Sequence, residues 1–381
     1  MIGPYKTESN RTISYKGNNL FPPMKDITDL NHKKNINEEM EGRVRQLGKE
    51  KMWGHLARIN HRINIVSNAY FDSIGALFTA LPLTTRMISS PGAVYGKEAL
   101  KYTSDTSPIT LKWFDLKEQA FLSESSQIYL EIALIQEKVN HVYSIYNSFR
   151  KERADATHLS EFHHIEYEGK ISQSENEKIA LGLLGSIIKD LLSFNKEDLS
   201  YFLNEEMLHL LRKISLEIQS IPRISLKESL ERLYQDTRDS KYKEFTLKNF
   251  GVWEEVRLTE LMGGPVIVKE FPLLEVPFYH SQLTEKDALV ANNADLIWGG
   301  YREILGSGER ISSVSELENK SKLFNLPKED YLPYLETREL PNYVRTSGFG
   351  LGWERFIQGI LNMPFIWSAA QFPRIDSILK P

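Results

Sequence analysis

The residues with the clearest chemistry lie in the stretch FRKERADATHLSEFHHIEYE, residues 149–168. Arg150 is followed closely by Glu152. A guanidinium binds phosphate oxygens through parallel hydrogen bonds and stays charged at any working pH, and a nearby carboxylate can accept a hydrogen bond from an adenine amino group. Taken alone, the pair is equally typical of a solvated charge pair on a strand edge, because short motifs recur by chance.

Two further side chains follow the same polar loop. Phe162 could stack on a purine and His158 could meet a terminal phosphate, although each also fits a core phenylalanine and a surface histidine. His163 and His164, together with Glu166 and Glu168, suggest a metal site. Alternation along a strand, however, places adjacent residues on opposite faces, so this adjacency does not favour chelation.

A second candidate site is EILGSGER, residues 303–310, in which glycines would let the backbone approach a ligand closely. Glu303 could hold Mg²⁺ on the phosphates of ATP, since Mg²⁺ takes only one or two carboxylates and leaves its other positions to water and phosphate. The alternative interpretation is a plain strand-turn-strand connection.

A third candidate is the glycine-rich run GFGLGWERF, residues 348–356. A strand of small residues would let a nucleotide lie flat, and the following helix would present Arg355 to a phosphate. The run also resembles a dinucleotide-binding loop, but it lacks the GxGxxG spacing and a following βαβ pattern.

Composition limits what these residues can belong to. The 381 residues carry a net charge of −4, which does not suggest a protein that coats a polyanion, and they include no cysteine, which excludes disulfides and thiolate chemistry. No apolar run reaches the roughly 18 residues of a membrane span, and the N-terminus has no hydrophobic signal core. We therefore expect a cytoplasmic protein with no membrane association.

Hydrophobic periodicity indicates which elements position the candidates. Residues 1–42 are expected to form a polar arm with little core, and residues 43–381 a single catalytic domain. A long amphipathic helix is predicted from residue 42 to about residue 78, with an apolar stripe of Ile59, Ile63, Val66 and Tyr70. Strands are predicted at 120–122, 142–146, 164–168, 265–271 and 294–298. A helical segment is predicted at about 172–250, in which Ser225 and Glu228 form a capping box. Consecutive strands without crossovers predict an α+β fold with an antiparallel sheet flanked by helices.

In this order the motifs resemble the class II aminoacyl-tRNA synthetases over about residues 43–378. The segments FRKE with HLSEF and GFGLGWERF resemble motifs 2 and 3, and LPL at 81–83 resembles the exit of motif 1. FLSESSQIYLE at 121–131 and YREILGSGER at 301–310 resemble the aspartyl/asparaginyl (D/K/N) branch, closest to asparaginyl-tRNA synthetase and its stand-alone asparagine synthetase-like paralogues.

The resemblance implies ATP-dependent activation of an amino acid as an aminoacyl-adenylate. It assigns Arg150 to the α-phosphate, Glu152 and Phe162 to the adenine, Arg355 to the γ-phosphate and Glu303 to Mg-ATP. His158 is a further expected ATP-binding residue. It assigns Ser125, Gln127, Glu166 and Arg310 to the amino acid. It further implies a homodimer, with motif 1 at the interface.

Several departures from the family pattern bear on the substrate. Leu130 stands where the aspartyl enzymes carry a lysine for the substrate carboxylate, which favours asparagine or a close analogue. Thr157 and Thr346 stand where the family has an arginine and a histidine. Residues 1–42 stand where an OB-fold anticodon-binding domain is expected. The acyl acceptor is therefore left open between a tRNA acceptor stem and another acceptor, such as ammonia, an amine or a carrier. A third possibility is that the chain is a non-catalytic paralogue.

Overall fold

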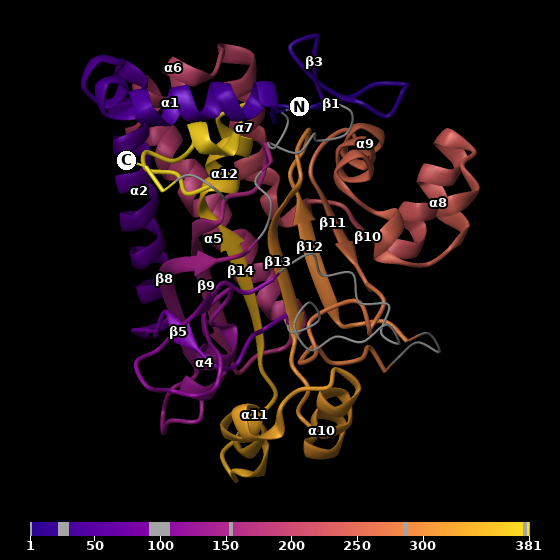
Figure 1. The fold of residues 1–381 in the computed structure, drawn as a ribbon. Coiled ribbons are helices and arrows are strands. Elements are labelled where there is room, and N and C mark those ends of the chain that lie inside the picture. Colours follow the sequence, from indigo (N-terminus) through magenta and orange to yellow (C-terminus); the bar gives the residue numbers. More distant parts are fainter. Residues whose placement is uncertain are drawn as a thin grey trace.

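An eight-stranded sheet with the order β10-β11-β12-β13-β14-β9-β8-β4 forms the centre of the molecule (Figure 1). The computed structural model describes residues 2–21, 30–90, 107–151, 155–284, 289–375 and 379–380. The six central strands pair antiparallel, whereas β10 and β4 pair parallel at the two edges. The predicted α+β fold with an antiparallel sheet is therefore confirmed. The strands are β4 (Leu77–Phe78), β8 (His141–Phe149), β9 (Glu161–Gly169), β10 (Arg223–Ser225), β11 (Val266–Lys269), β12 (Asn293–Ile297), β13 (Glu303–Glu309) and β14 (Ser347–Gly352).

The register of this sheet brings the three candidate motifs together. Glu166 on β9 pairs with Gly350 on β14, and Gly350 pairs with Gly306 on β13. Residues 303–309 form one continuous strand, so the strand-turn-strand interpretation of this segment is wrong. Because a strand alternates its side chains between two faces, the small residues of β13 and β14 leave space above the sheet beside the side chains of β9.

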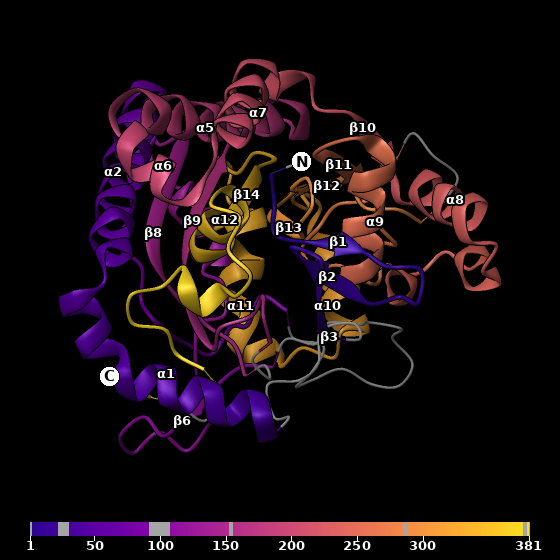
Figure 2. The ribbon, with the colours of Figure 1, turned by 90° about the horizontal axis from the view of Figure 1, so that it is seen from above.

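Helices that include α2 and α5 cover one face of the sheet, as the view from above shows (Figure 2). Of the predicted stripe on α2, Ile59, Ile63 and Val66 are buried and Tyr70 is partly buried. The single helix expected from residue 42 is instead two helices, because Glu50 is extended and caps the start of α2. The helices of this part are α1 (Leu30–Lys49), α2 (Lys51–Ser73), α4 (Gln127–Ala133), α5 (Gln173–Phe194), α6 (Lys196–Phe202) and α7 (Glu205–Glu217).

The segment between β9 and β11 is mainly helical. Ser172 caps α5 and Ser225 caps α8, each in a capping box with a glutamate three residues later, so the predicted Ser225–Glu228 box is confirmed. A short strand, β10, interrupts the helices immediately before α8. The remaining helices are α8 (Leu226–Thr237), α9 (Val252–Met262), α10 (Val314–Leu323), α11 (Lys328–Leu335) and α12 (Trp353–Ile360).

The N-terminal residues pack against the body of the molecule. Residues 6–21 contain a small antiparallel sheet, and Ile2, Tyr5 and Ile13 lie in the main hydrophobic core. Tyr5 donates its backbone N–H to Gly300. Ile2, Tyr5 and Ile13 of the expected arm are therefore buried against other elements, and the boundary drawn at residue 42 falls inside α1. Its strands are β1 (Lys6–Thr7), β2 (Ile13–Tyr15) and β3 (Asn18–Phe21).

A third, three-stranded sheet of order β5-β7-β6 lies beside α4. The predicted strand at 120–122 is confirmed as its central strand, and it leads into α4. The strands are β5 (Thr84–Thr85), β6 (Thr110–Leu111) and β7 (Ala120–Leu122).

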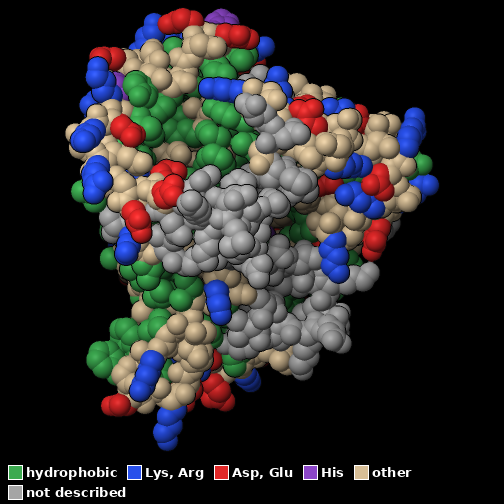
Figure 3. Space-filling view, turned by 45° about the horizontal axis from the view of Figure 1, so that its top comes forward, with side chains coloured by type: hydrophobic (Ala, Val, Ile, Leu, Met, Phe, Trp, Pro, Cys, Tyr) green, Lys and Arg blue, Asp and Glu red, His purple; other side chains and the backbone are tan. Residues whose placement is uncertain are grey.

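The described surface carries both apolar patches and mixed charge. On the face drawn in Figure 3, hydrophobic side chains gather in patches on the left, whereas acidic and basic side chains are interspersed on the right. Within the described ranges, no helix combines the length and the apolar character needed to cross a membrane.

Candidate active site

Two adjoining cavities lie above β9, β13 and β14. The Arg355 cavity is lined by Arg150, His158, Phe162 and Arg355, among others. The Arg310 cavity, of about 220 Å³, is lined by Ser125, Gln127, Glu166 and Arg310, among others. Arg150, His164, Glu303 and Gly350 line both cavities. The sheet thus brings nine predicted site residues to one continuous cleft.

Arg150 lies where the two cavities meet. It follows the last residue of β8, and its backbone N–H donates to Ser160, which holds the end of the strand against the segment leading into β9. Its guanidinium carbon is 5.2 Å from the centre of the Phe162 ring, within the range of a cation–π contact. Phe162 in turn meets the His164 ring edge-on. The aromatic ring and the cation are therefore positioned together.

Arg355 faces the cleft from the first turn of α12. Its Nη1 donates to the backbone carbonyl of Glu303 at 3.1 Å, so α12 and β13 are joined at the cleft. His164 lies between Arg355 and Arg150, and burial together with these two cations lowers its pKa well below the usual range. A neutral imidazole leaves the positive charge here to the two guanidinium groups, as binding of an anion requires.

A buried ion pair joins Arg310, which lines the floor of the Arg310 cavity, to Glu168 behind it. Arg310 donates from Nε to Glu168 Oε1 at 3.0 Å and from Nη2 to Oε2 at 2.8 Å. Gln127 also donates to Glu168 and to the carbonyl of Tyr167. A Cβ at Gly348 would lie 2.0 Å from Glu168, so only glycine fits at this position. Burial raises the pKa of Glu168, while Arg310 opposes that shift.

Glu166 is the carboxylate on the wall of the same cavity. It accepts hydrogen bonds from Ser125 at 2.6 Å and from the hydroxyl of Tyr146. Burial raises its pKa, and these two hydrogen bonds oppose the rise. The carboxylate is thus held in a fixed position where it can accept a hydrogen bond from a cationic ligand group.

Three carboxylates converge beside the place where the cavities meet. Asp295 on β12 lies near Glu303 on β13 and Glu255 on α9, and all three line a further pocket on that side. Burial raises the pKa of Asp295 well above its usual range, and the charges of Glu303 and Glu255 raise it further. A divalent cation would relieve this repulsion. Among the described residues, no group of three or more His, Cys, Asp or Glu side chains has the geometry to hold a metal ion.

Two predicted site residues require comment. Glu152 lies outside the described residues. His158 lines the Arg355 cavity, but its Nε2 is 3.3 Å from Arg302 Nη1 and its Nδ1 is 2.8 Å from Asp155. His163 and His164 point to opposite sides of β9, as predicted, since His163 contacts Glu354 on α12 and His164 contacts Ser148.

Leu130 does not line either cavity. Its side chain is fully buried with Ala133, Leu134 and Val142 in a small hydrophobic cluster. The neutral residue at this position therefore adds no charge to the cleft, but it is not a contact for a ligand. The ion pair of Arg310 and Glu168 is a more direct guide to what the cavity accepts.

Sequence reasoning named Glu168 only as part of a possible metal site and missed its pairing with Arg310, and it missed Asp295 and Arg302 entirely. Glu168 follows Glu166 by two residues on one strand, so the alternation of side chains could have placed both on the same face. Asp295 sits in a strand that looks apolar in sequence. Arg302 acts through residues more than 140 positions away, for which no sequence signal exists.

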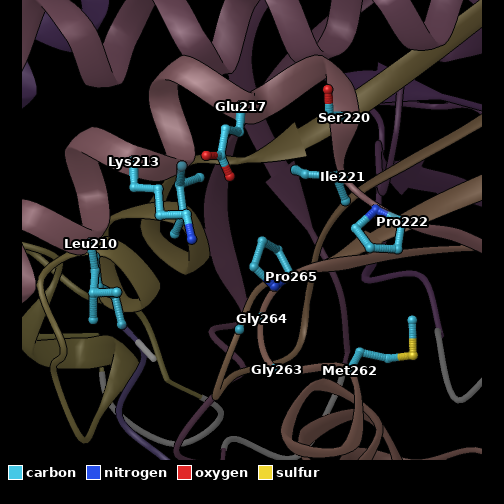
Figure 4. A pocket seen from close by; sticks show the side chains of 13 residues that line it. Leu210, Lys213, Glu217, Ser220, Ile221, Pro222, Met262, Gly263, Gly264 and Pro265 are labelled. Carbon is cyan, nitrogen blue, oxygen red and sulfur yellow. The ribbon is translucent and has the colours of Figure 1, made fainter.

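A separate pocket near α7 contains none of the predicted site residues. It is lined by α7, the turn after α9 and the segment before β10, mainly with apolar side chains, and Lys213 and Glu217 of α7 are also among its lining residues (Figure 4). It lacks the cations and the buried carboxylates of the cleft. The chemistry of the molecule is therefore concentrated at β9, β13 and β14.

An antiparallel sheet with Arg150 directly after β8 and Arg355 on α12, beside a glycine-lined cleft, is the arrangement that the resemblance to class II synthetases leads us to expect. The profile of the family "tRNA synthetases class II (D, K and N)" matches residues 36–376. The chain belongs to this family, which confirms the resemblance drawn from its motifs.

Comparisons with individual proteins are consistent with this family. The chain is 30% identical over 273 residues to the asparagine–tRNA ligase of Thermococcus kodakarensis, a match that covers 71% of this chain and 60% of that protein. It is 30% identical over 332 residues to the asparagine–tRNA ligase of Thermus thermophilus, covering 85% and 70%. Against several of these relatives the match thus spans about three fifths of their length.

Solved structures share the fold. Asparaginyl-tRNA synthetase from Pyrococcus horikoshii, complexed with asparaginyl-adenylate, matches with a TM-score of 0.78 at 24% identity, over 97% of this chain and 78% of that one. Asparaginyl-tRNA synthetase from Entamoeba histolytica, also with asparaginyl-adenylate, matches with a TM-score of 0.76 at 21% identity, over 91% and 72%.

Proposed function

We propose that this chain activates asparagine with ATP, forming asparaginyl-adenylate, and transfers the asparaginyl group to tRNA. The observation that carries the proposal is the pair of Arg310 and Glu168 at the floor of a small cavity. The guanidinium can donate to a side-chain carbonyl, and the carboxylate behind it balances its charge. A neutral amide side chain suits this floor better than a carboxylate, which would meet Glu168 as a like charge.

The rest of the cleft suits the other parts of the reactants. Glu166 would accept from the ammonium group of the amino acid, beside Ser125 and Gln127. Phe162 would stack on the adenine, with Glu152 at its amino group. Arg150 would bind the α-phosphate, and Arg355 with His158 the terminal phosphates.

Catalysis would rest on positioning and charge stabilisation. The substrate carboxylate attacks the α-phosphorus of ATP, a carboxyl–phosphate bond forms, the bond to the β-phosphate breaks, and pyrophosphate leaves. Arg150 lies where these groups would meet and would stabilise charge developing on the phosphate oxygens. No protein nucleophile or general base is required, because the carboxylate is already ionised.

Magnesium would be held by Glu303 together with Asp295. A bound cation would offset the repulsion between these carboxylates and Glu255. Two carboxylates with phosphate oxygens are a common environment for Mg²⁺. When bound, the ion would neutralise charge on the phosphates.

A homodimer is part of the proposal. Leu77 and Phe78 on the edge strand β4 are 53% and 57% exposed, and Leu83 follows at 42%. An edge strand with exposed apolar side chains is suited to burial against a second copy. Phe78→Asp should therefore shift the protein from dimer to monomer in sedimentation velocity, and a wild-type monomer at micromolar concentration would contradict this part.

The acceptor has two alternatives to tRNA. The adenylate could pass to ammonia, an amine or a carrier, as in asparagine synthesis, or the chain could be a non-catalytic paralogue. The positions of Arg150, Glu303 and Arg355 in one cleft favour a catalytic role. With ATP and tRNA as partners, we assign the reaction to the cytoplasm.

Three measurements test the proposal. Exchange of labelled pyrophosphate into ATP, run over the full panel of amino acids, should be supported by asparagine or a close analogue; exchange with none would rule out activation. Transfer of labelled asparagine to unfractionated tRNA should follow. AMP release that depends on ammonium or an amine, without RNA, would instead favour the alternative acceptor.

A further inference from the structure

Arg302 joins three elements beside the Arg355 cavity. It lies just before β13, and its side chain is 14% exposed. Its Nε donates to Glu255 on α9 at 3.0 Å, and its Nη1 donates to the hydroxyl of Thr157 at 2.9 Å. The same Nη1 is 3.3 Å from Nε2 of His158. One guanidinium therefore ties α9 to the loop that enters β9.

The contacts around Arg302 close a ring. The Thr157 hydroxyl donates to Asp155 Oδ1 at 2.9 Å, and Nδ1 of His158 lies 2.8 Å from Asp155 Oδ2. Burial would raise the pKa of Asp155, but His158 and Arg302 lower it below the usual range, so the carboxylate is ionised. An ionised carboxylate accepts hydrogen bonds only, which places the His158 proton on Nδ1.

This ring sets the state of the imidazole. Nη1 of Arg302 is an N–H donor, so its contact with Nε2 of His158 is a hydrogen bond only when Nε2 carries a lone pair and the ring proton is on Nδ1. The ring is thus fixed in orientation and in tautomer by groups on both sides. Removing Arg302 would leave Nε2 without this donor and would leave Glu255 without its cation.

We infer that Arg302 is a positioning residue for nucleotide binding, which holds Thr157 and His158 in place at the wall of the Arg355 cavity. The inference rests on the proposed function, because it takes the ligand of this cavity to be ATP. A second consequence concerns His158 itself, which acts on the phosphates from a fixed orientation rather than as a mobile surface side chain.

The first test is binding of Mg-ATP, measured by calorimetry on the full chain. Arg302→Met should weaken the binding of ATP about 10- to 100-fold, because the loss of hydrogen bonds from a charged group costs roughly 1.5–3 kcal/mol. The binding of asparagine should change less than twofold. Thr157→Val should cause a smaller loss. In the double variant the two losses should not add, because both act through the same loop.

Arg257→Met is the matched control. Arg257 lies on α9 with Glu255 but pairs with Asp236 and Glu260, away from the cleft. It should bind ATP normally. If Arg302→Met fails to fold, Arg302→Lys keeps the charge without the fork of donors, and it should still weaken ATP.

The second test reads the histidine directly. In ¹⁵N spectra of the free protein, the His158 ring should show the Nδ1–H tautomer in the wild type and a mixture of tautomers in Arg302→Met. An unchanged tautomer, or equal losses of ATP and asparagine affinity, would overturn the inference. If ATP binding depends on Arg302 but pyrophosphate exchange is absent, the proposed function fails and the inference stands. A wild-type chain that binds no ATP would overturn both.

Discussion

The two ends of the cleft handle charge differently. At the Arg310 cavity, Arg310 is paired bidentately with the buried Glu168. At the Arg355 cavity, Arg150 and Arg355 face the space, and burial together with these two cations lowers the pKa of His164 well below its usual range. The charge of Arg310 is thus met by a buried carboxylate, whereas two guanidinium groups face one space at the other end, so the first end suits a neutral side chain and the second an anion.

The largest expected effect is at the positive end. Arg150→Ala should lower the rate of pyrophosphate exchange by roughly 10²–10³-fold, since it removes the donor aimed at the developing charge. Thermal unfolding should change little, because Arg150 is partly exposed. Arg62→Ala, which breaks an ion pair with Asp190 on the outer helices, should leave exchange unchanged. Near-normal exchange in Arg150→Ala would show that its assignment is wrong.

An intermediate effect is expected at the balanced end. Glu168→Gln keeps the shape of the side chain but leaves the Arg310 charge unmatched, so the floor should lose its preference for a neutral side chain. Asparagine-dependent kcat/KM should fall about 10-fold, the loss of roughly one charged hydrogen bond, and the ratio of asparagine to aspartate activity should fall with it.

The matched change is Glu177→Gln, which removes a carboxylate paired with Arg223 on the outer part of the sheet. This variant should leave the ratio unchanged. A Glu168→Gln enzyme with the wild-type ratio would show that the ion pair does not set specificity.

The smallest effect concerns the carboxylates between the two ends. Asp295→Asn removes one of three charges that repel each other, so the free energy of unfolding without Mg²⁺ should rise slightly, by about 1 kcal/mol. The concentration of Mg²⁺ needed for half-maximal exchange should rise at the same time. Titrations of Mg²⁺ and thermal unfolding measure the two effects, and a loss of stability would contradict the repulsion argument.

The fold could be predicted from local signals. The alternation in 164–168, the stripe of Ile59, Ile63 and Val66, and the Ser225 capping box each depend on neighbouring residues, and each is confirmed. The break at Glu50 was missed because apolar spacing continues across it, and only the backbone shows where one helix ends and the next begins.

The candidate site likewise contains some residues that could be predicted from the sequence and others that could not. The residues of the three motifs were predicted because each motif is contiguous in sequence, and β9, β13 and β14 then bring them together. The partners that set their charge could not be predicted. Glu168 acquires its role only through Arg310, and Arg302 only through Thr157 and His158, across sequence separations that no periodic pattern spans.

The preference for asparagine over aspartate tests the account most directly. The measurement is kcat/KM for pyrophosphate exchange with each amino acid at saturating Mg-ATP. A charge-balanced floor predicts that asparagine is preferred by at least about 100-fold, as expected when the wrong substrate brings a like charge to a buried carboxylate. Equal activity with the two, or a preference for aspartate, would contradict the central claim that Arg310 and Glu168 together select a neutral amide.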